Sequence, residues 1–105
     1  MITTSRDDAI LRITLDRQER RNSLTHNMID ELTAILSSAA YDDSLRAIAL
    51  TGAGPDFCTG ADWVATNSSG QRPRTGDLVR RIPLTANRLI ELIATIQLPV
   101  VCAVR

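Results

Sequence analysis

The chain contains 105 residues, with twelve basic side chains, twelve acidic side chains and a formal net charge of zero. That length fits one small domain, and a composition of 44% hydrophobic and 23% charged residues is typical of a folded globular protein. The charge balance removes the electrostatic case for binding nucleic acid or an acidic membrane surface. All twelve basic residues are arginines, which excludes a Schiff-base lysine and a lysine-containing phosphate loop.

The sequence shows no sign of membrane insertion or of a disulfide framework. No apolar stretch approaches the roughly 18 residues of a membrane-spanning helix, and the N-terminus lacks the apolar segment of a signal peptide. Cys58 and Cys102 each have apolar neighbours and belong to no CxxC or Cys/His cluster. We therefore expect two buried free thiols, no metal site and a cytoplasmic location.

The first half of the chain predicts a strand pair followed by a helix. Apolar and polar residues alternate over 9–15, which is typical of a half-buried strand, and this strand would pair with an edge strand near 2–5. A charged connector covers 16–22. Thr25 is the expected N-cap of a helix that ends near 41–43. Apolar residues recur along this helix at helical spacing, namely Met28, Ile29, Leu32, Ile35, Leu36 and Ala39.

The second half predicts another strand, a loop, a helix and a last strand. The apolar run 46–51 is typical of a buried strand, so strand, helix and strand in this order indicate a parallel crossover in an α/β fold. Residues 66–77 lack periodicity and predict a surface loop. A helix is expected from about Pro83 to Ile96, and a strand at 100–104. The apolar face of that helix is predicted to comprise Leu89, Ile90, Leu92, Ile93 and Ile96.

The segment 52–62, directly after the second predicted strand, carries the chemistry that the residues suggest. Three glycines in it allow the backbone to turn and to bring N–H groups close to a ligand. A dinucleotide-binding GxGxxG motif would need glycine at Phe57, so that motif is absent. The remaining interpretation is an anion pocket of main-chain amides around Gly60 and Ala61, which would stabilise an oxyanion. A simple turn is the structural alternative.

Several separated motifs occur in a characteristic order along the chain. They are ITLDRQERRNSLT at 13–25, RAIALTGAG at 46–54, FCTGAD at 57–62 and LPVVCAV at 98–104. Together they resemble the N-terminal part of the crotonase superfamily, the enoyl-CoA hydratase/isomerase proteins. The resemblance leaves only 67–77 unmatched and is specific for the superfamily, not for one reaction within it. It implies that residues 1–105 form the N-terminal part of a single crotonase-like domain, a truncated α/β spiral of ββα units.

The resemblance also implies an activity. Members of the family bind acyl-CoA thioesters, and two backbone N–H groups hold the thioester oxygen while an enolate forms. Ala61 matches the first of these donors, and each such donor is worth ~3–4 kcal/mol of barrier. The nominal reaction is the addition of water to a 2-enoyl-CoA thioester, with coenzyme A as part of the substrate and no separate cofactor. Full-length members form trimers or hexamers, so we expect a homo-trimer or hexamer.

Further substrate contacts follow from the matched positions. The stretch that approaches the CoA nucleotide and pantetheine is matched by Arg20, Arg21, Asn22 and Ser23, and a guanidinium there can pair with a phosphate. Pro55 and Asp56 depart from the family pattern, since many relatives have a basic residue at this place, near the CoA phosphates. Asp62 is expected to support the loop by hydrogen bonds to backbone rather than to act as an acid. The residues that would flank the acyl-CoA are Thr59, Gly60, Asp62 and Trp63.

Proton transfer is the part of the reaction that no residue here matches. The second oxyanion donor and two catalytic carboxylates of hydratases are expected beyond Arg105. The glutamates present, Glu19, Glu31 and Glu91, match neither carboxylate. The leading hypothesis is therefore the N-terminal fragment of an acyl-CoA-processing enzyme. A non-catalytic module that binds CoA or a partner protein, and an inactive truncated product, are the alternatives.

Overall fold

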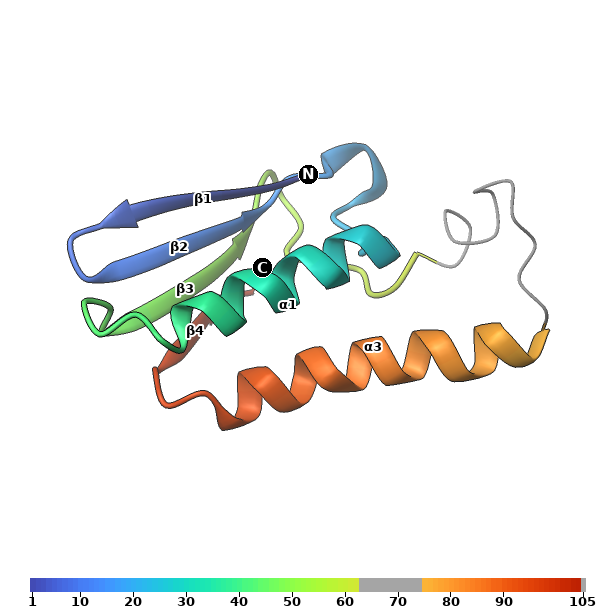
Figure 1. Cartoon of the computed structure of the whole chain (residues 1–105). Coiled ribbons are helices and arrows are strands. Elements are labelled where there is room, and N and C mark those ends of the chain that lie inside the picture. The colour runs from blue at the N-terminus through green and yellow to red at the C-terminus, as the bar shows by residue number, and fades with distance from the viewer. Residues whose placement is uncertain (63–74, 105) are drawn as a thin grey trace.

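The computed structural model describes residues 1–62 and 75–104, with the backbone alone described over 75–83 (Figure 1). It forms a sheet and two helices in two layers. In chain order the elements are β1 (Ile2–Asp7), β2 (Ile10–Leu15), the 3-10 helix η1 (Gln18–Arg20), α1 (His26–Ala39), β3 (Ala47–Gly52), α3 (Thr75–Thr95) and β4 (Val100–Ala103). The mixed α/β class expected from the sequence is confirmed.

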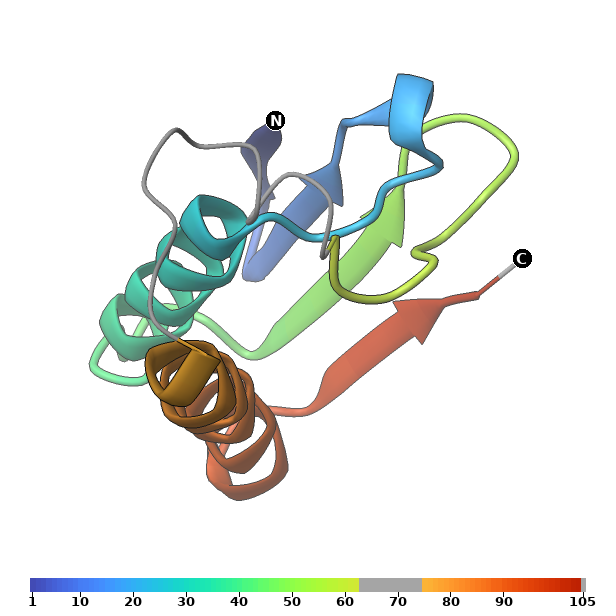
Figure 2. The ribbon, with the colours of Figure 1, turned by 90° about the vertical axis from the view of Figure 1, so that its right-hand side faces the viewer.

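The four strands lie side by side in the order β1-β2-β3-β4 (Figure 2). β1 and β2 form an antiparallel hairpin in which Ile2 lies opposite Leu15. β3 runs parallel to β2, with Gly52 beside Leu15, and β4 runs parallel to β3. The predicted strand pair and the parallel crossover are both confirmed. As a result, β2, β3 and β4 all end at the same edge of the sheet.

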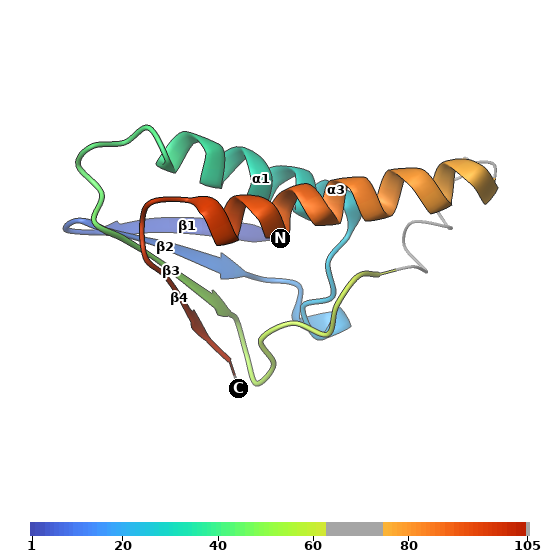
Figure 3. The ribbon, with the colours of Figure 1, turned by 90° about the horizontal axis from the view of Figure 1, so that it is seen from below.

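Both helices cover one face of the sheet, as Figure 3 shows. Alternate residues of β2 and β3 point toward them and are buried, because side chains along a strand alternate between faces. α1 contributes a stripe of apolar residues at helical spacing. The buried core consists of Ile13, Leu15, Met28, Ile29, Leu32, Leu36, Ala39, Leu45, Ile48, Leu50 and Leu89.

The start of α1 is fixed by the predicted cap. Thr25 has an extended backbone, and its hydroxyl accepts a hydrogen bond of 3.1 Å from the Met28 N–H. That bond satisfies one of the N–H groups that a helix leaves without a partner in its first turn. The helix ends at Ala39, two residues before the predicted end, and the Ala40 N–H donates back to the Leu36 carbonyl.

The predicted start of the last helix is wrong. α3 begins at Thr75 rather than near Pro83, so residues 75–77, which we expected in a loop, belong to the helix. Proline interrupts the hydrogen-bond ladder of a helix, which is why its position suggested a start. The apolar spacing continues upstream of the proline, however, and it outweighs that signal. The rest of the predicted loop, 66–74, lies outside the described residues.

Two side-chain predictions are also corrected. Ile90 is 62% exposed, because it lies one position away from the stripe that buries Leu89 and partly buries Ile93. Cys58 is half-buried and Cys102 is exposed, so neither cysteine is the buried thiol that the sequence predicted. Cys102 lies on β4, the edge strand beyond which the described chain places no further strand. Among the described residues, neither helix combines the length and apolarity that a membrane crossing requires.

Candidate active site

Two segments meet at the carboxyl ends of β2 and β3 (Figure 2). The first is the connector that follows β2, residues 16–25, and the second is the loop that follows β3, residues 53–62. The Ala53 N–H donates to the Leu15 carbonyl at 2.8 Å, which continues the sheet into both segments. Every predicted site residue that the structure describes lies in one of these two segments. The parallel crossover therefore brings together residues about 40 positions apart in sequence.

Asn22 joins the two segments from within. Its side chain is fully buried, its Oδ1 accepts from the Arg17 N–H at 2.9 Å, and its Nδ2 donates to the carbonyls of Ala53 and Asp56. A side chain at Gly52 would lie 2.8 Å from this amide and 2.4 Å from two loop carbonyls, so the position requires glycine. Asn22 itself has φ +58°, a left-handed conformation that asparagine tolerates better than most residues. Its role is to brace the loop.

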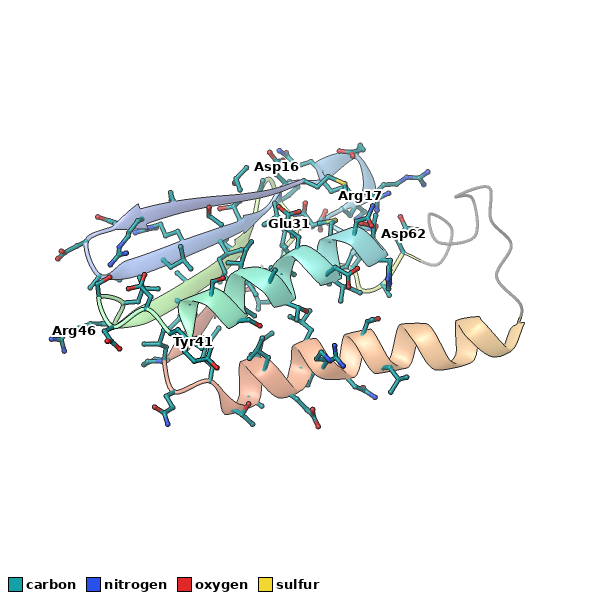
Figure 4. The ribbon with its side chains drawn as sticks, viewed as in Figure 1. Asp16, Arg17, Glu31, Tyr41, Arg46 and Asp62 are labelled. Atoms are coloured by element: carbon teal, nitrogen blue, oxygen red, sulfur yellow. The ribbon has the colours of Figure 1, made fainter. Side chains whose placement is uncertain are left out.

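A buried ion pair ties the connector to the end of the loop. The Arg17 Nη1 donates to the Asp62 carboxylate at 2.5 Å, and both side chains are only about a tenth exposed. The same nitrogen donates to the Ser23 hydroxyl and carbonyl, at 2.9 Å and 3.1 Å. Figure 4 shows Arg17 and Asp62 at the N-terminal end of α1. Ser23 therefore presents its hydroxyl to Arg17 and Asp62.

This ion pair lies beside a short backbone bridge that orients Ala61. The Leu24 N–H donates to the Gly60 carbonyl at 2.7 Å, and the Asp62 N–H donates to the Leu24 carbonyl at 2.8 Å. In such a parallel bridge the N–H of the middle residue, Ala61, points away from the neighbouring segment. In the part of the chain that the structure describes, the Ala61 N–H donates to no protein acceptor. The residue is exposed, so this donor is open to a ligand.

Gly60 and Thr59 shape the approach to that donor. Gly60 has φ +103°, which only glycine adopts readily, while the space around its missing side chain is open. Its N–H donates to the Cys58 sulfur at 3.4 Å. The Thr59 hydroxyl donates to the Arg21 carbonyl at 3.4 Å. The glycine is therefore required by the backbone turn and not by crowding.

Arg21 is held by an ion pair that the sequence did not predict. Its Nε and Nη2 donate to the two carboxylate oxygens of Asp56 at 3.3 Å and 3.4 Å. The Arg21 side chain is 72% exposed and that of Asp56 is 30% exposed. The hydrogen bond to Asp56, with the negative charge of that carboxylate, raises the pKa of Arg21 above its usual value. The arginine expected to meet a phosphate already has an anionic partner.

Trp63, His26 and the glutamates are not part of this cluster among the described residues. Trp63 falls outside the described residues. His26 is the first residue of α1, and its Nε2 lies 3.4 Å from the Asp30 carboxylate one turn later. Three glutamates are exposed on η1, α1 and α3, namely Glu19, Glu31 and Glu91. Arg17 was missed by sequence analysis, because its partner lies 45 residues away and no local pattern marks it.

Comparison with known proteins identifies the family to which this chain belongs. The family model described as enoyl-CoA hydratase/isomerase matches residues 5–105. The chain belongs to the enoyl-CoA hydratase/isomerase family. The resemblance to the crotonase superfamily noted from the motifs is thereby confirmed.

Individual relatives agree with this family assignment. The 1,2-epoxyphenylacetyl-CoA isomerase of Escherichia coli is 36% identical over 93% of this chain and 37% of its own length. The enoyl-CoA hydratase AFT3-1 of Alternaria alternata is 40% identical over 70% of this chain and 24% of its own. The crystal structure of an enoyl-CoA hydratase/isomerase from Xanthobacter autotrophicus matches with a TM-score of 0.88 and 30% identity. The match covers 99% of this chain and 38% of that one.

These coverages carry two conclusions. The fold described here is part of the crotonase fold, because the high TM-scores extend over nearly the whole described chain. The chain spans less than two-fifths of the length of the curated relatives that it matches.

Proposed function

We propose that the exposed Ala61 N–H is an oxyanion donor in a crotonase-type site that binds acyl-CoA thioesters. The observation that carries this proposal is the Leu24–Ala61 bridge, which turns the Ala61 N–H away from the connector and leaves it without a protein acceptor in the described chain. The nominal reaction is hydration of a 2-enoyl-CoA thioester. Coenzyme A enters as part of the substrate, and the proposal needs neither a metal nor a separate cofactor.

The chemistry explains why a backbone amide matters here. When water adds across the double bond conjugated with the thioester, negative charge develops on the thioester oxygen. An N–H group already aimed at that oxygen needs no rearrangement as the charge forms, and it lowers the barrier by ~3–4 kcal/mol. The bridge to Leu24, the ion pair of Arg17 with Asp62 and the glycine at position 60 would hold Ala61 in place. The loop is thus suited to stabilise charge.

Proton transfer needs groups other than those of the described loop. Hydration requires an acid or base near each of the two carbons that change. The carboxylates of Asp56 and Asp62 are each paired with an arginine, so neither is proposed as that group. A non-catalytic module that binds CoA is the second candidate function, because both site carboxylates are engaged in ion pairs.

The wider setting forms part of the same proposal. We take residues 1–105 as the N-terminal part of a single crotonase-like domain, which is consistent with the partial coverage of each relative. The remaining proposed contacts to the acyl-CoA come from Arg21, Ser23, Thr59, Gly60, Asp62 and Trp63. We further propose a homo-trimer or hexamer for the whole protein and a cytoplasmic location.

The test follows the Ala61 amide directly. The chain, labelled with ¹⁵N, is titrated with a crotonyl-CoA analogue whose double bond is saturated, and separately with free CoA. The Ala61 amide proton should shift downfield with the thioester and not with CoA, because only the thioester brings a carbonyl oxygen. Ala61→Pro removes the N–H and should weaken thioester binding about three- to tenfold, the range expected for one hydrogen bond. Ala61→Ser keeps the N–H and is the control.

Binding without any response of the Ala61 amide would contradict the proposed donor. A chain that binds the thioester through Ala61 but does not hydrate crotonyl-CoA supports the oxyanion site and favours the non-catalytic module over the enzyme. Hydration above the uncatalysed rate favours the enzyme, and it would place the missing proton-transfer groups within these 105 residues.

A further inference from the structure

We propose that Asp56 is a specificity-determining residue, which lowers the affinity of the site for the phosphate groups of its ligand by holding Arg21 in an ion pair. This inference rests on the proposed function, since it concerns how the same acyl-CoA site divides its binding between the phosphate end and the pantetheine thioester. The observation that carries it is the two-point contact from the Arg21 Nε and Nη2 to the two carboxylate oxygens of Asp56.

The backbone fixes both partners of this pair. Arg21 and Asn22 are consecutive residues in the left-handed conformation, with φ +55° and +58°, which sets the direction of the Arg21 side chain. The buried Asn22 amide then donates to the Asp56 carbonyl at 2.7 Å, so the two chain segments are held together immediately beside the ion pair. The backbones of Arg21 and Asp56 are therefore held next to each other, which places the two side chains within reach of one another.

The pair uses the part of the guanidinium that a phosphate would need. Arginine binds carboxylates and phosphates alike through two parallel N–H donors, and Asp56 already accepts from one such edge. A phosphate must either displace Asp56 or use the remaining donors while lying close to a like charge. The raised pKa of Arg21 agrees with a stable cation that is neutralised locally by Asp56.

The exposure of Arg21 allows a ligand phosphate to compete with Asp56 for its guanidinium group. The Arg21 side chain is 72% exposed, so a ligand can reach it, whereas the side chain of Asp56, a residue of the loop, is 30% exposed. An isolated arginine would offer a ligand phosphate one unit of positive charge, but the pair offers none. We therefore expect the pantetheine thioester to supply most of the binding free energy and the phosphate end to supply little.

The experiment compares two ligands that carry the same butyryl thioester and differ in their phosphate groups. Binding of butyryl-CoA and of butyryl-pantetheine, which lacks the nucleotide and its phosphates, is measured by calorimetry on the chain and on Asp56→Asn. The substitution should raise the affinity for butyryl-CoA about two- to fivefold, the range expected when an exposed ion pair no longer competes. Affinity for butyryl-pantetheine should not change. The gain should shrink as salt rises, because screening weakens a phosphate–arginine contact at the surface.

Matched variants separate local competition from net charge. Asp43→Asn makes the same change in net charge in the loop after α1, which Figure 4 places at the opposite end of that helix from Asp62, and it should leave both affinities unchanged. Asp56→Glu keeps the negative charge and should not give the gain. Arg21→Ala combined with Asp56→Asn should abolish the gain, because the freed cation is absent.

The outcomes separate a failure of the Asp56 inference from a failure of the proposed acyl-CoA site. If Asp56→Asn strengthens both ligands equally, or strengthens neither while the original chain binds both, the inference is overturned and the acyl-CoA site stands. If the original chain binds neither ligand, the proposed function falls and takes the inference with it. A gain confined to butyryl-CoA supports both. Should Asp56→Asn fail to fold, Asp56→Ser gives the same comparison.

Discussion

Arg17 shows how one buried side chain can organise a site that it does not enter. Its Nη1 donates hydrogen bonds to the Asp62 carboxylate and to two oxygens of Ser23. Its backbone N–H donates to the Asn22 side chain. Burying two charges costs several kcal/mol of solvation, which their attraction and additional hydrogen bonds must offset. Here the Asp62 carboxylate and the Ser23 hydroxyl lie 2.5 Å and 2.9 Å from the Arg17 Nη1. Arg17 thus holds the end of the loop segment that carries Ala61.

Arg17→Met should lower the free energy of unfolding by about 3–5 kcal/mol, because it leaves the buried Asp62 carboxylate without its cation. Urea denaturation followed by circular dichroism measures the loss. Arg12→Met is the control, because Arg12 and Asp7 form an ion pair whose side chains are 54% and 68% exposed. It should cost about 1 kcal/mol or less. Equal losses in the two variants would contradict the structural role given to Arg17.

At the residue scale, the motifs predicted the backbone turn at Gly60 but not the ion pairs around it. The Gly60–Ala61 turn was found from glycine spacing and then from family resemblance, and the structure places it beside the connector that contains Arg21 and Ser23. The pairs Arg17–Asp62 and Arg21–Asp56 were not found, since each joins residues 35 or more positions apart. Local spacing does not encode which arginine pairs with which aspartate. The pairing depends on how the fold brings distant segments together.

At the scale of elements, capping and periodicity carried most of the information. α1 begins where Thr25 predicted, and its buried residues follow the expected apolar stripe. Pro83 predicts a helix start because proline suits the first turn, but α3 begins at Thr75, and the apolar spacing continues before the proline. Proline therefore marked a position inside the helix. Periodicity over many residues was the better guide to this boundary than one residue with a strong local preference.

Thr25→Ala should destabilise the protein by about 1 kcal/mol, because the Met28 N–H loses its hydroxyl acceptor. For a protein of this size that corresponds to a fall in Tm of about 4–8 °C, measured by thermal denaturation. Thr25→Ser should retain most of the stability. The control on the same helix is Thr33→Ala, whose lost hydroxyl bond to the Ile29 carbonyl is offset by the better helix propensity of alanine. A larger fall for Thr33→Ala would refute the cap.

The whole molecule has a sheet with two unlike edges. β1 at one edge carries Arg6 and Asp7 among mostly polar residues, whereas β4 at the other reads Val-Val-Cys-Ala and has no charge. Figure 3 shows α1 and α3 on one side of the sheet, with β4 as its last strand. Val101 is 62% exposed there. Charged residues at a sheet edge oppose pairing with another chain, so β4 is the edge that invites it.

This asymmetry predicts concentration-dependent self-association of the 105-residue chain through β4. Val101→Lys should weaken the association by about tenfold or more, because a charge at an uncapped edge must be desolvated when a second strand pairs there. Sedimentation velocity over a range of concentrations measures it. Thr3→Lys adds the same charge to β1 and should leave the association unchanged, since that edge already carries charged residues. A chain that stays monomeric at all concentrations, or that responds equally to both lysines, would show that the apolar edge strand does not govern association.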